Sequence, residues 1–355
     1  MINNRIQFWR IIMTYVIAIY HFNKRYDVFT SGYIAVEFFF MISGYLLVSK
    51  YYAMKRTNEL GRMPALKYFC GRYIHFLPYS AVAFFTAFVA VGIYRGYKLA
   101  DYGYGLFTHL PELFLVNMLG FQTGGGVSFN DITWYLSVLL ILSFVIWYLL
   151  KLNDRVYKMI ILPLSVAVIY VYLFVEYGML GVHEQFALPF LATGILRGLA
   201  DMNMGIAAYT LAGICNHKHA KYMGVISTVC LFVGGVILPQ FYYHSKWDFL
   251  MSAMIFVGVA FAFGCDDNSI FDRKVIIRWS EITLVIYLNH EVITIFVTSV
   301  LRERSIFTFV IWFLLITIYS AIEFYVMKCI YRKIHKQGGL RNEEGKKLEG
   351  KMGSI

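Results

Sequence analysis

The sequence predicts an all-α polytopic membrane protein with about ten transmembrane helices, and three observations support this fold class. Hydrophobic residues make up 59% of the 355 residues, and the mean hydropathy is +0.61. Charged residues make up only 15%, against roughly 25% in a soluble domain. Apolar stretches of about 20 residues recur along the chain. Together these features exclude a soluble globular enzyme, a disordered chain and a disulfide scaffold, and the unbroken apolar runs argue against a β-barrel.

Apolar stretches separated by polar breaks give the order of the expected spans. They are residues 8–23, 33–50, 73–94, 132–150, 156–175, 186–214, 222–241, 248–265, 279–300 and 306–328. The stretch 186–214 is the least regular, because it contains Arg197, Asp201 and several glycines. It fits either one bent span or two half-spans lining a cavity. Residues 1–336 are expected to form the membrane domain, and the polar residues 337–355 a disordered cytoplasmic tail.

Basic residues between the spans predict the orientation of the chain. The connection 50–72 carries six Lys and Arg against one Glu, and later basic clusters come in phase with it. Because cytoplasmic loops collect Lys and Arg, an even number of spans places both termini in the cytoplasm. Topology therefore explains the net charge of +11 without a nucleic-acid partner. The five cysteines are scattered and lack CxxC spacing, so neither a disulfide nor a metal site is expected.

Two polar side chains of the first expected span share one helical face. Arg10 and His21 are eleven residues apart, which at 100° per residue leaves them only about 20° apart around the helix. The rise between them is about 16.5 Å, roughly half of the hydrocarbon core. Arg10 is then expected at the cytoplasmic headgroup level and His21 near mid-depth. A topology anchor for Arg10 and a structural hydrogen bond for His21 are the alternatives.

The second span carries a carboxylate, Glu37, about four residues inside its outer boundary, where it needs a charged or hydrogen-bonding partner. A short hairpin joins the first two spans, so Glu37 is expected to pair with His21 and orient its ring, with a purely structural ion pair as the alternative. Close helix packing would also explain the small pair Ser43-Gly44. In the ninth span, the polar run 289–291 indicates a wet cavity.

Five motifs in the same order resemble the acyltransferase 3 family of integral membrane acyltransferases, over roughly residues 5–330. The motifs are Arg10-x10-His21, the segment Gly32 to Tyr45 (GYIAVEFFFMISGY), Arg72-x-x-His75-x-x-Pro78, Trp134-x-Leu136-Ser137, and Ser280 followed by Tyr287-Leu288-x-His290. Two positions depart from the family pattern. His75 stands where the family usually has a second arginine, and Leu139 stands where many members have a glutamate.

This resemblance implies an enzyme of the plasma (cytoplasmic) membrane that moves an acyl group, usually acetyl, from cytoplasmic acyl-CoA to a hydroxyl of an extracytoplasmic or lipid-linked glycan. Acyl-CoA is then a donor substrate, and no permanently bound cofactor is expected. The bilayer, acyl-CoA and the glycan are the expected partners. The resemblance leaves open which acceptor is used, and whether the acyl group is acetyl or longer. It also leaves open whether transfer is direct or passes through a covalent intermediate, and whether the protein forms a homo-oligomer.

The same interpretation assigns a role to each candidate residue. The guanidinium groups of Arg10 and Arg72 would hold the donor phosphates. His21 would act as general base, with Glu37 as its orienting group. The pocket or oxyanion candidates are Ser43, Trp134, Ser280 and His290. The competing function class is a transporter or flippase for a glycan or small solute. The sequence has no clear internal repeat, which argues against a transporter.

Overall fold

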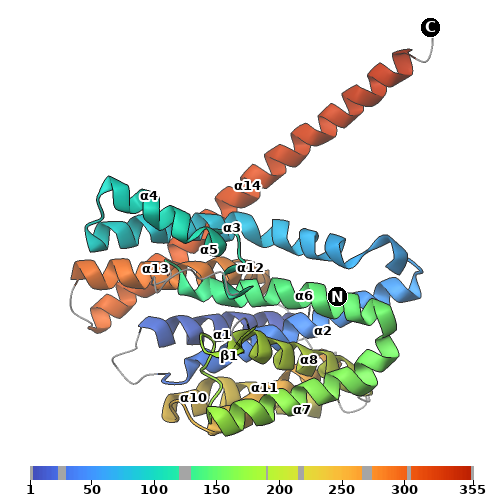
Figure 1. Ribbon diagram of the computed structural model, residues 1–355, viewed down its shortest axis with the longest axis vertical. Coiled ribbons are helices and arrows are strands. Elements are labelled where there is room, and N and C mark those ends of the chain that lie inside the picture. The colour runs from blue at the N-terminus through green and yellow to red at the C-terminus, as the bar shows by residue number, and fades with distance from the viewer. Residues whose placement is uncertain are drawn as a thin grey trace.

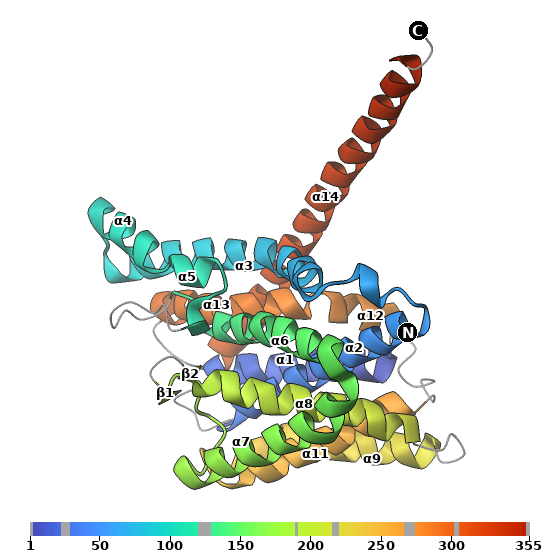
Figure 2. The same cartoon turned by 45° about the vertical axis from the view of Figure 1, so that its right-hand side comes forward.

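The structure, a computed structural model, describes residues 3–22, 29–119, 129–188, 191–214, 220–265, 274–301 and 305–352. Figures 1 and 2 show a bundle of helices with a small hairpin at one end. The longer helices are α1 (Asn4–Phe22), α2 (Ala35–Arg56), α3 (Ala65–Arg95), α4 (Leu99–Thr108), α6 (Trp134–Val156), α7 (Leu162–Glu176), α8 (Thr193–Ile214), α9 (Ala220–Phe232), α11 (Trp247–Gly264), α12 (Lys274–Glu281), α13 (Thr283–Leu301) and α14 (Ile306–Met352).

Short helical elements complete the connections. The short α-helices are α5 (Leu110–Leu113) and α10 (Leu238–Phe241). The 3₁₀ turns are η1 (Gly32–Ile34), η2 (Leu60–Arg62), η3 (Asn117–Leu119) and η4 (Asp131–Thr133), and the π-helical turns are η5 (Tyr157–Ile161) and η7 (Val233–Ile237).

Several helices are long and apolar enough to cross a membrane, which confirms the polytopic all-α fold in general terms. Among the described residues there are seven such stretches, against the ten or so expected spans. One of the seven, Asp131–Glu176, contains both α6 and α7. The chain leaves helical geometry at Asn153 (φ −159°, ψ 97°) and reverses there (Figure 1). The exact number of spans and the side of each terminus stay predictions.

The irregular stretch 186–214 forms a hairpin followed by one continuous helix, in place of a bent span or two half-spans. Strands β1 (Phe186–Leu188) and β2 (Leu191–Ala192) pair antiparallel, with Phe186 opposite Ala192. Helix α8 then begins at Thr193, whose backbone N–H donates to the Gln185 carbonyl over 2.8 Å. The charged residues Arg197 and Asp201 therefore belong to one continuous helix.

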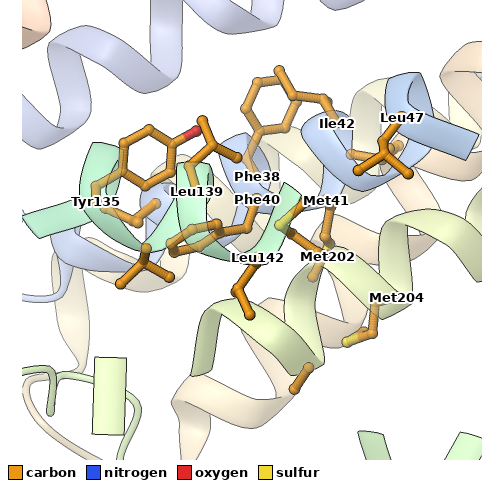
Figure 3. Close-up of a cluster of buried hydrophobic side chains, with 14 of the residues drawn as sticks. Phe38, Phe40, Met41, Ile42, Leu47, Tyr135, Leu139, Leu142, Met202 and Met204 are labelled. Carbon is orange, nitrogen blue, oxygen red and sulfur yellow. The ribbon is translucent and has the colours of Figure 1, made fainter. Parts of the chain in front are cut away.

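A cluster of buried hydrophobic side chains fills the space where α2, α6 and α8 meet, as Figure 3 shows. Helices α2 and α8 cross at glycines. A Cβ atom on Gly44 would overlap the backbone carbonyl of Met202, and one on Gly205 would overlap that of Met41. Small residues at a helix crossing let the two backbones approach. The expectation that Gly44 serves close packing is therefore confirmed.

We expect Gly205→Ala to destabilise the protein by about 1–3 kcal/mol, because the new methyl group overlaps a backbone carbonyl that cannot rotate away. Gly213→Ala is the matched control, since Gly213 lies on the same helix with nothing within 4 Å of its would-be Cβ. An exposed Gly to Ala change in a helix is neutral or slightly stabilising. Melting temperatures of the two purified variants in detergent test this. Equal melting temperatures would contradict tight packing at the crossing.

Helix α14 extends past the bundle, and its last part projects away from the other helices (Figure 1). It reaches Met352, whereas the sequence predicts disorder over residues 337–355. An isolated polar helix gains little stability in water. The disordered tail and the domain boundary at residue 336 therefore stay predictions.

Candidate functional site

A cavity of about 580 Å³ brings four of the predicted site residues together. Those four lining residues are Arg10 on α1, Ser43 on α2, Arg72 on α3 and Ser280 on α12. We call this space the arginine cavity. His75 and Leu139, the two departures from the family pattern, also line it. Its volume falls in the range typical of small-molecule and cofactor sites.

Both arginines are held in place by neutral partners. The Arg10 guanidinium donates to Gln7 Oε1 over 2.8 Å and to Thr283 Oγ1 over 3.3 Å. The Arg72 guanidinium donates to the Tyr68 hydroxyl over 3.2 Å and lies 5.6 Å from the centre of the Phe76 ring. Because no described carboxylate forms an ion pair with either guanidinium, both charges remain available to an anion.

The two serines of this cavity make local contacts. Ser280 Oγ donates to the Ile277 carbonyl over 2.8 Å, at the break between α12 and α13. Ser43 lies in hydrogen-bond contact with the Tyr135 hydroxyl. Both serines therefore line the cavity with their hydroxyls in local hydrogen bonds.

His21 and Trp134 line a second cavity of about 260 Å³, called here the histidine cavity. Tyr20, Tyr33 and Arg197 also line it. It combines aromatic rings with polar groups, a lining that suits sugar-like ligands better than apolar ones.

Tyr287 lines both cavities and separates the two halves of the predicted site. Its hydroxyl donates to the Ile132 carbonyl over 3.0 Å, and its ring centroid lies 5.5 Å from that of Tyr135. His21 is not among the residues that line the arginine cavity. Tyr287 is the residue that the linings of the two cavities share.

His21 lies beside the middle of a neighbouring helix. Helix α1 ends at Phe22, and its Arg10 bonds to Thr283, the first residue of α13. The His21 ring centroid lies 5.0 Å from that of His290. His290 is about 10 Å from the start of α13 and about 16 Å from its end, at 1.5 Å per residue. The depth of His21 in the bilayer stays a prediction.

His290 is completely buried and lines neither cavity. Its Nδ1 lies 2.6 Å from the Tyr287 carbonyl oxygen. Because a carbonyl oxygen only accepts, Nδ1 carries the hydrogen, and Nε2 of the neutral ring keeps a lone pair. His290 therefore contacts His21 as a buried neighbour rather than as a wall of a pocket.

Glu37 pairs with Arg197 rather than with His21, so the predicted His21–Glu37 pair is not formed. Both Nε and Nη2 of Arg197 lie 2.7 Å from Glu37 Oε1, and the two side chains are 1% and 0% exposed. Arg197 Nη2 also donates to the Tyr33 carbonyl over 3.1 Å. A carboxylate in a low-dielectric interior is stable only beside an opposite charge, and α8, packed against α2, supplies one.

The pair belongs to a buried polar cluster on four helices. Asp201, one turn beyond Arg197 on α8, accepts a 2.5 Å hydrogen bond from the Tyr170 hydroxyl of α7. That hydroxyl lies 2.7 Å from Ser252 Oγ on α11. In the sequence, Arg197 and Asp201 stand out only as an irregularity of the apolar stretch 186–214. Their spacing of four residues in an apolar stretch was the available signal of a buried charged face.

Trp134 stacks between charged or polar neighbours at the start of α6. Its ring lies 4.5 Å from the His183 ring at an interplanar angle of 20°, and the Arg197 guanidinium is 5.6 Å from its centre. The chain just before it is fixed by Glu112, which accepts hydrogen bonds from the backbone N–H groups of Phe129 and Asn130. These contacts set the position of the tryptophan against the histidine cavity.

A hydrogen-bonded tyrosine, Tyr33, also lines this cavity. The Tyr33 hydroxyl donates to Asp248 Oδ2 over 2.6 Å, and the Leu180 backbone N–H donates to the same oxygen. His244, in the connection before α11, stacks on the Tyr33 ring. Burial lowers the pKa of His244, and the nearby Asp248 carboxylate opposes that shift. A neutral His244 ring at neutral pH therefore fits its stacked position.

A family model described as an acyltransferase domain (Acyl_transf_3) matches residues 4–326, a range that contains every candidate residue named above. No curated protein matches the chain, and no solved structure matches it. The match confirms the resemblance that the sequence motifs predicted.

Proposed function

The chain belongs to the acyltransferase 3 family, whose members are membrane acyltransferases, and from this we propose that its reaction is the transfer of an acyl group, acetyl first, from acyl-CoA to a glycan hydroxyl. The glycan would be extracytoplasmic or lipid-linked. In this proposal the arginine cavity opens to the cytoplasm, and the histidine cavity faces the opposite side of the plasma membrane.

The observation that carries the proposal is the meeting of two guanidinium groups in one cavity. Arg10 and Arg72 come from different helices and line the same space of about 580 Å³. Guanidinium groups bind phosphate and pyrophosphate through paired hydrogen bonds. Apolar residues such as Phe39 and Phe263 also line this cavity, which suits the pantetheine arm. The remaining donor atoms of the two arginines are thus the natural binding site for the anionic end of acyl-CoA.

The proposed chemistry uses an imidazole on the other side of Tyr287. The acceptor oxygen attacks the thioester carbon, so a C–O bond forms and the C–S bond breaks. His21 takes the hydroxyl proton, and the thiolate of CoA leaves and is then protonated. Because Glu37 is engaged by Arg197, the group placed against the His21 ring is His290. Tyr287 must move aside or let the acyl end pass for the thioester to reach His21.

We expect Arg10→Ala and Arg72→Ala to raise the KM for acetyl-CoA by about tenfold or more each, with a smaller effect on kcat. The reason is that each removes a charge-assisted contact to the donor, worth roughly 1.5–3 kcal/mol. Arg62→Ala is the matched control, because Arg62 is exposed and outside the cavity. Steady-state kinetics on purified protein measure the effect. A variant with unchanged KM but inverted membrane orientation would instead identify that arginine as a topology anchor.

Label transfer separates this proposal from the transporter alternative. Purified protein in vesicles is incubated with labelled acetyl-CoA and a candidate glycan, and the glycan is analysed by mass spectrometry. Labelled glycan together with free CoA supports the acyltransferase. Movement of unmodified glycan across the membrane without consumption of acetyl-CoA would support the transporter.

A further inference from the structure

We propose that the mouth of the histidine cavity holds a binding site for one divalent transition-metal ion, Zn²⁺ in the first instance, formed by Asp131, His183 and Glu184. Asp131 opens the turn η4 before α6, and the other two residues precede strand β1. All three line the cavity that also contains His21. This inference concerns ion binding and does not depend on the proposed acyl transfer. It also departs from the expectation, based on the cysteines alone, that no metal site is present.

The spacing of the three side chains fits one ion better than it fits hydrogen bonds. His183 Nε2 lies 3.7 Å from an Asp131 oxygen and 3.6 Å from a Glu184 oxygen. Both separations are too long for a hydrogen bond. Ligand atoms bound to one tetrahedral ion at about 2.0–2.2 Å lie roughly 3.3–3.6 Å from each other. All three ligand atoms fall within 4.8 Å of one another.

A small cavity also lies against these three side chains. It has a volume of about 20 Å³ and is lined by Asp131, His183, Glu184 and also Asn117. That volume suffices for roughly one water-sized particle. The protein thus leaves space for about one ion or water beside the three side chains.

Two buried polar atoms beside this space lack a hydrogen-bond partner among the described residues. They are His183 Nε2 and Asn117 Oδ1, and the Asn117 residue is only 5% exposed. Buried polar atoms without a partner are rare, because losing water without a replacement costs free energy. A cation coordinated by the imidazole nitrogen, with the amide oxygen beside it, would satisfy both. The His183 ring is held in position because it stacks on the Trp134 ring.

The donor set selects the class of ion. One imidazole nitrogen with two carboxylate oxygens suits Zn²⁺, whereas Mg²⁺ prefers six oxygen ligands in an octahedron. The two carboxylates supply the charge that offsets the ion, and Glu184 is 69% exposed, which leaves an entry path. Three protein ligands leave a coordination position open for a ligand oxygen from the histidine cavity, such as a hydroxyl or a carboxylate.

Equilibrium dialysis of the full-length protein in detergent tests the proposal. The protein, with any purification tag removed, is stripped with a chelator and titrated with Zn²⁺ in excess Mg²⁺, and bound zinc is counted by mass spectrometry. We expect one saturable site per chain in the wild type. Glu184→Gln and His183→Gln should each weaken zinc binding by at least about tenfold. Losing a residue that only hydrogen-bonds to a metal ligand already costs about tenfold or more in metal affinity, and losing a ligand should cost no less.

The control variant is Glu176→Gln, which removes an exposed carboxylate outside the cluster and should bind zinc normally. Melting temperatures guard against misfolding, since Glu184 is exposed and its replacement should leave the zinc-free protein unchanged. Zinc should raise the melting temperature of the wild type and of Glu176→Gln, but not of Glu184→Gln. Absence of saturable binding in the wild type, or undiminished binding in both ligand variants, would overturn the site.

Discussion

His21→Ala is expected to lower kcat for acyl transfer by about 10²–10⁴-fold, the usual contribution of a positioned general base. His21 lines the histidine cavity and contacts the His290 ring, at the end of α1 beside the middle of α13. Without the imidazole, nothing at that position accepts the acceptor hydroxyl proton. The measurement is label transfer from acetyl-CoA by purified protein, together with its abundance in the membrane.

Two further variants separate catalysis from packing at this position. His21→Gln keeps a polar side chain without a basic nitrogen, so its activity should fall nearly as far as that of His21→Ala. Tyr15→Phe, on the same helix, removes a 2.8 Å hydroxyl contact to Thr317 and should leave transfer near normal. Substantial transfer by either His21 variant would reject His21 as the base, and so would a loss of activity explained by low abundance alone.

Arg197→Met is expected to cause the largest loss of stability, about 3–5 kcal/mol. The guanidinium is 1% exposed and is the cation that pairs with Glu37, with Asp201 beside it on the same helix. Removing it leaves two buried carboxylates without an opposite charge. Membrane abundance and the melting temperature in detergent should therefore both fall sharply.

A second substitution shows whether unpaired charge is the cause. In the double variant Arg197→Met/Glu37→Gln one carboxylate is neutral, so part of the lost melting temperature should return. Lys55→Met is the control, because the Lys55–Asp154 pair is largely exposed and such pairs contribute little. If Arg197→Met melts like the wild type but loses activity, Arg197 acts at the histidine cavity and the structural interpretation is wrong.

Much of the fold could be predicted because its signals are local. Apolar stretches located the main helices, closely in some cases, such as 248–265 for α11 (Trp247–Gly264). Other bounds differ by six residues or more, as for 132–150 and α6 (Trp134–Val156). The stretch 186–214 was harder, because a short hairpin and the start of a helix are both apolar there. The count of spans also depended on α1 and α8, whose charged residues lower their hydropathy.

The candidate site was predictable where one helix or one motif carried the information. The shared face of Arg10 and His21 follows from their spacing on α1, and the motif order placed Arg72 with Arg10. The structure keeps both arginines in one cavity but places His21 in another, with Tyr287 between them. The division into two cavities cannot be predicted from spacing within a single helix, because the residues that line each cavity come from different helices.

Hydropathy, helical spacing and short motifs are properties of neighbouring positions, so the sequence was enough for the membrane class, the family and the set of candidate residues. Only the tertiary structure decided that Glu37 pairs with Arg197, since that contact joins residues 160 positions apart across the packed helices α2 and α8. It likewise gathered Asp131, His183 and Glu184 from two separate connections. Buried charges take whichever partner packing brings within reach, and packing is settled by the whole chain.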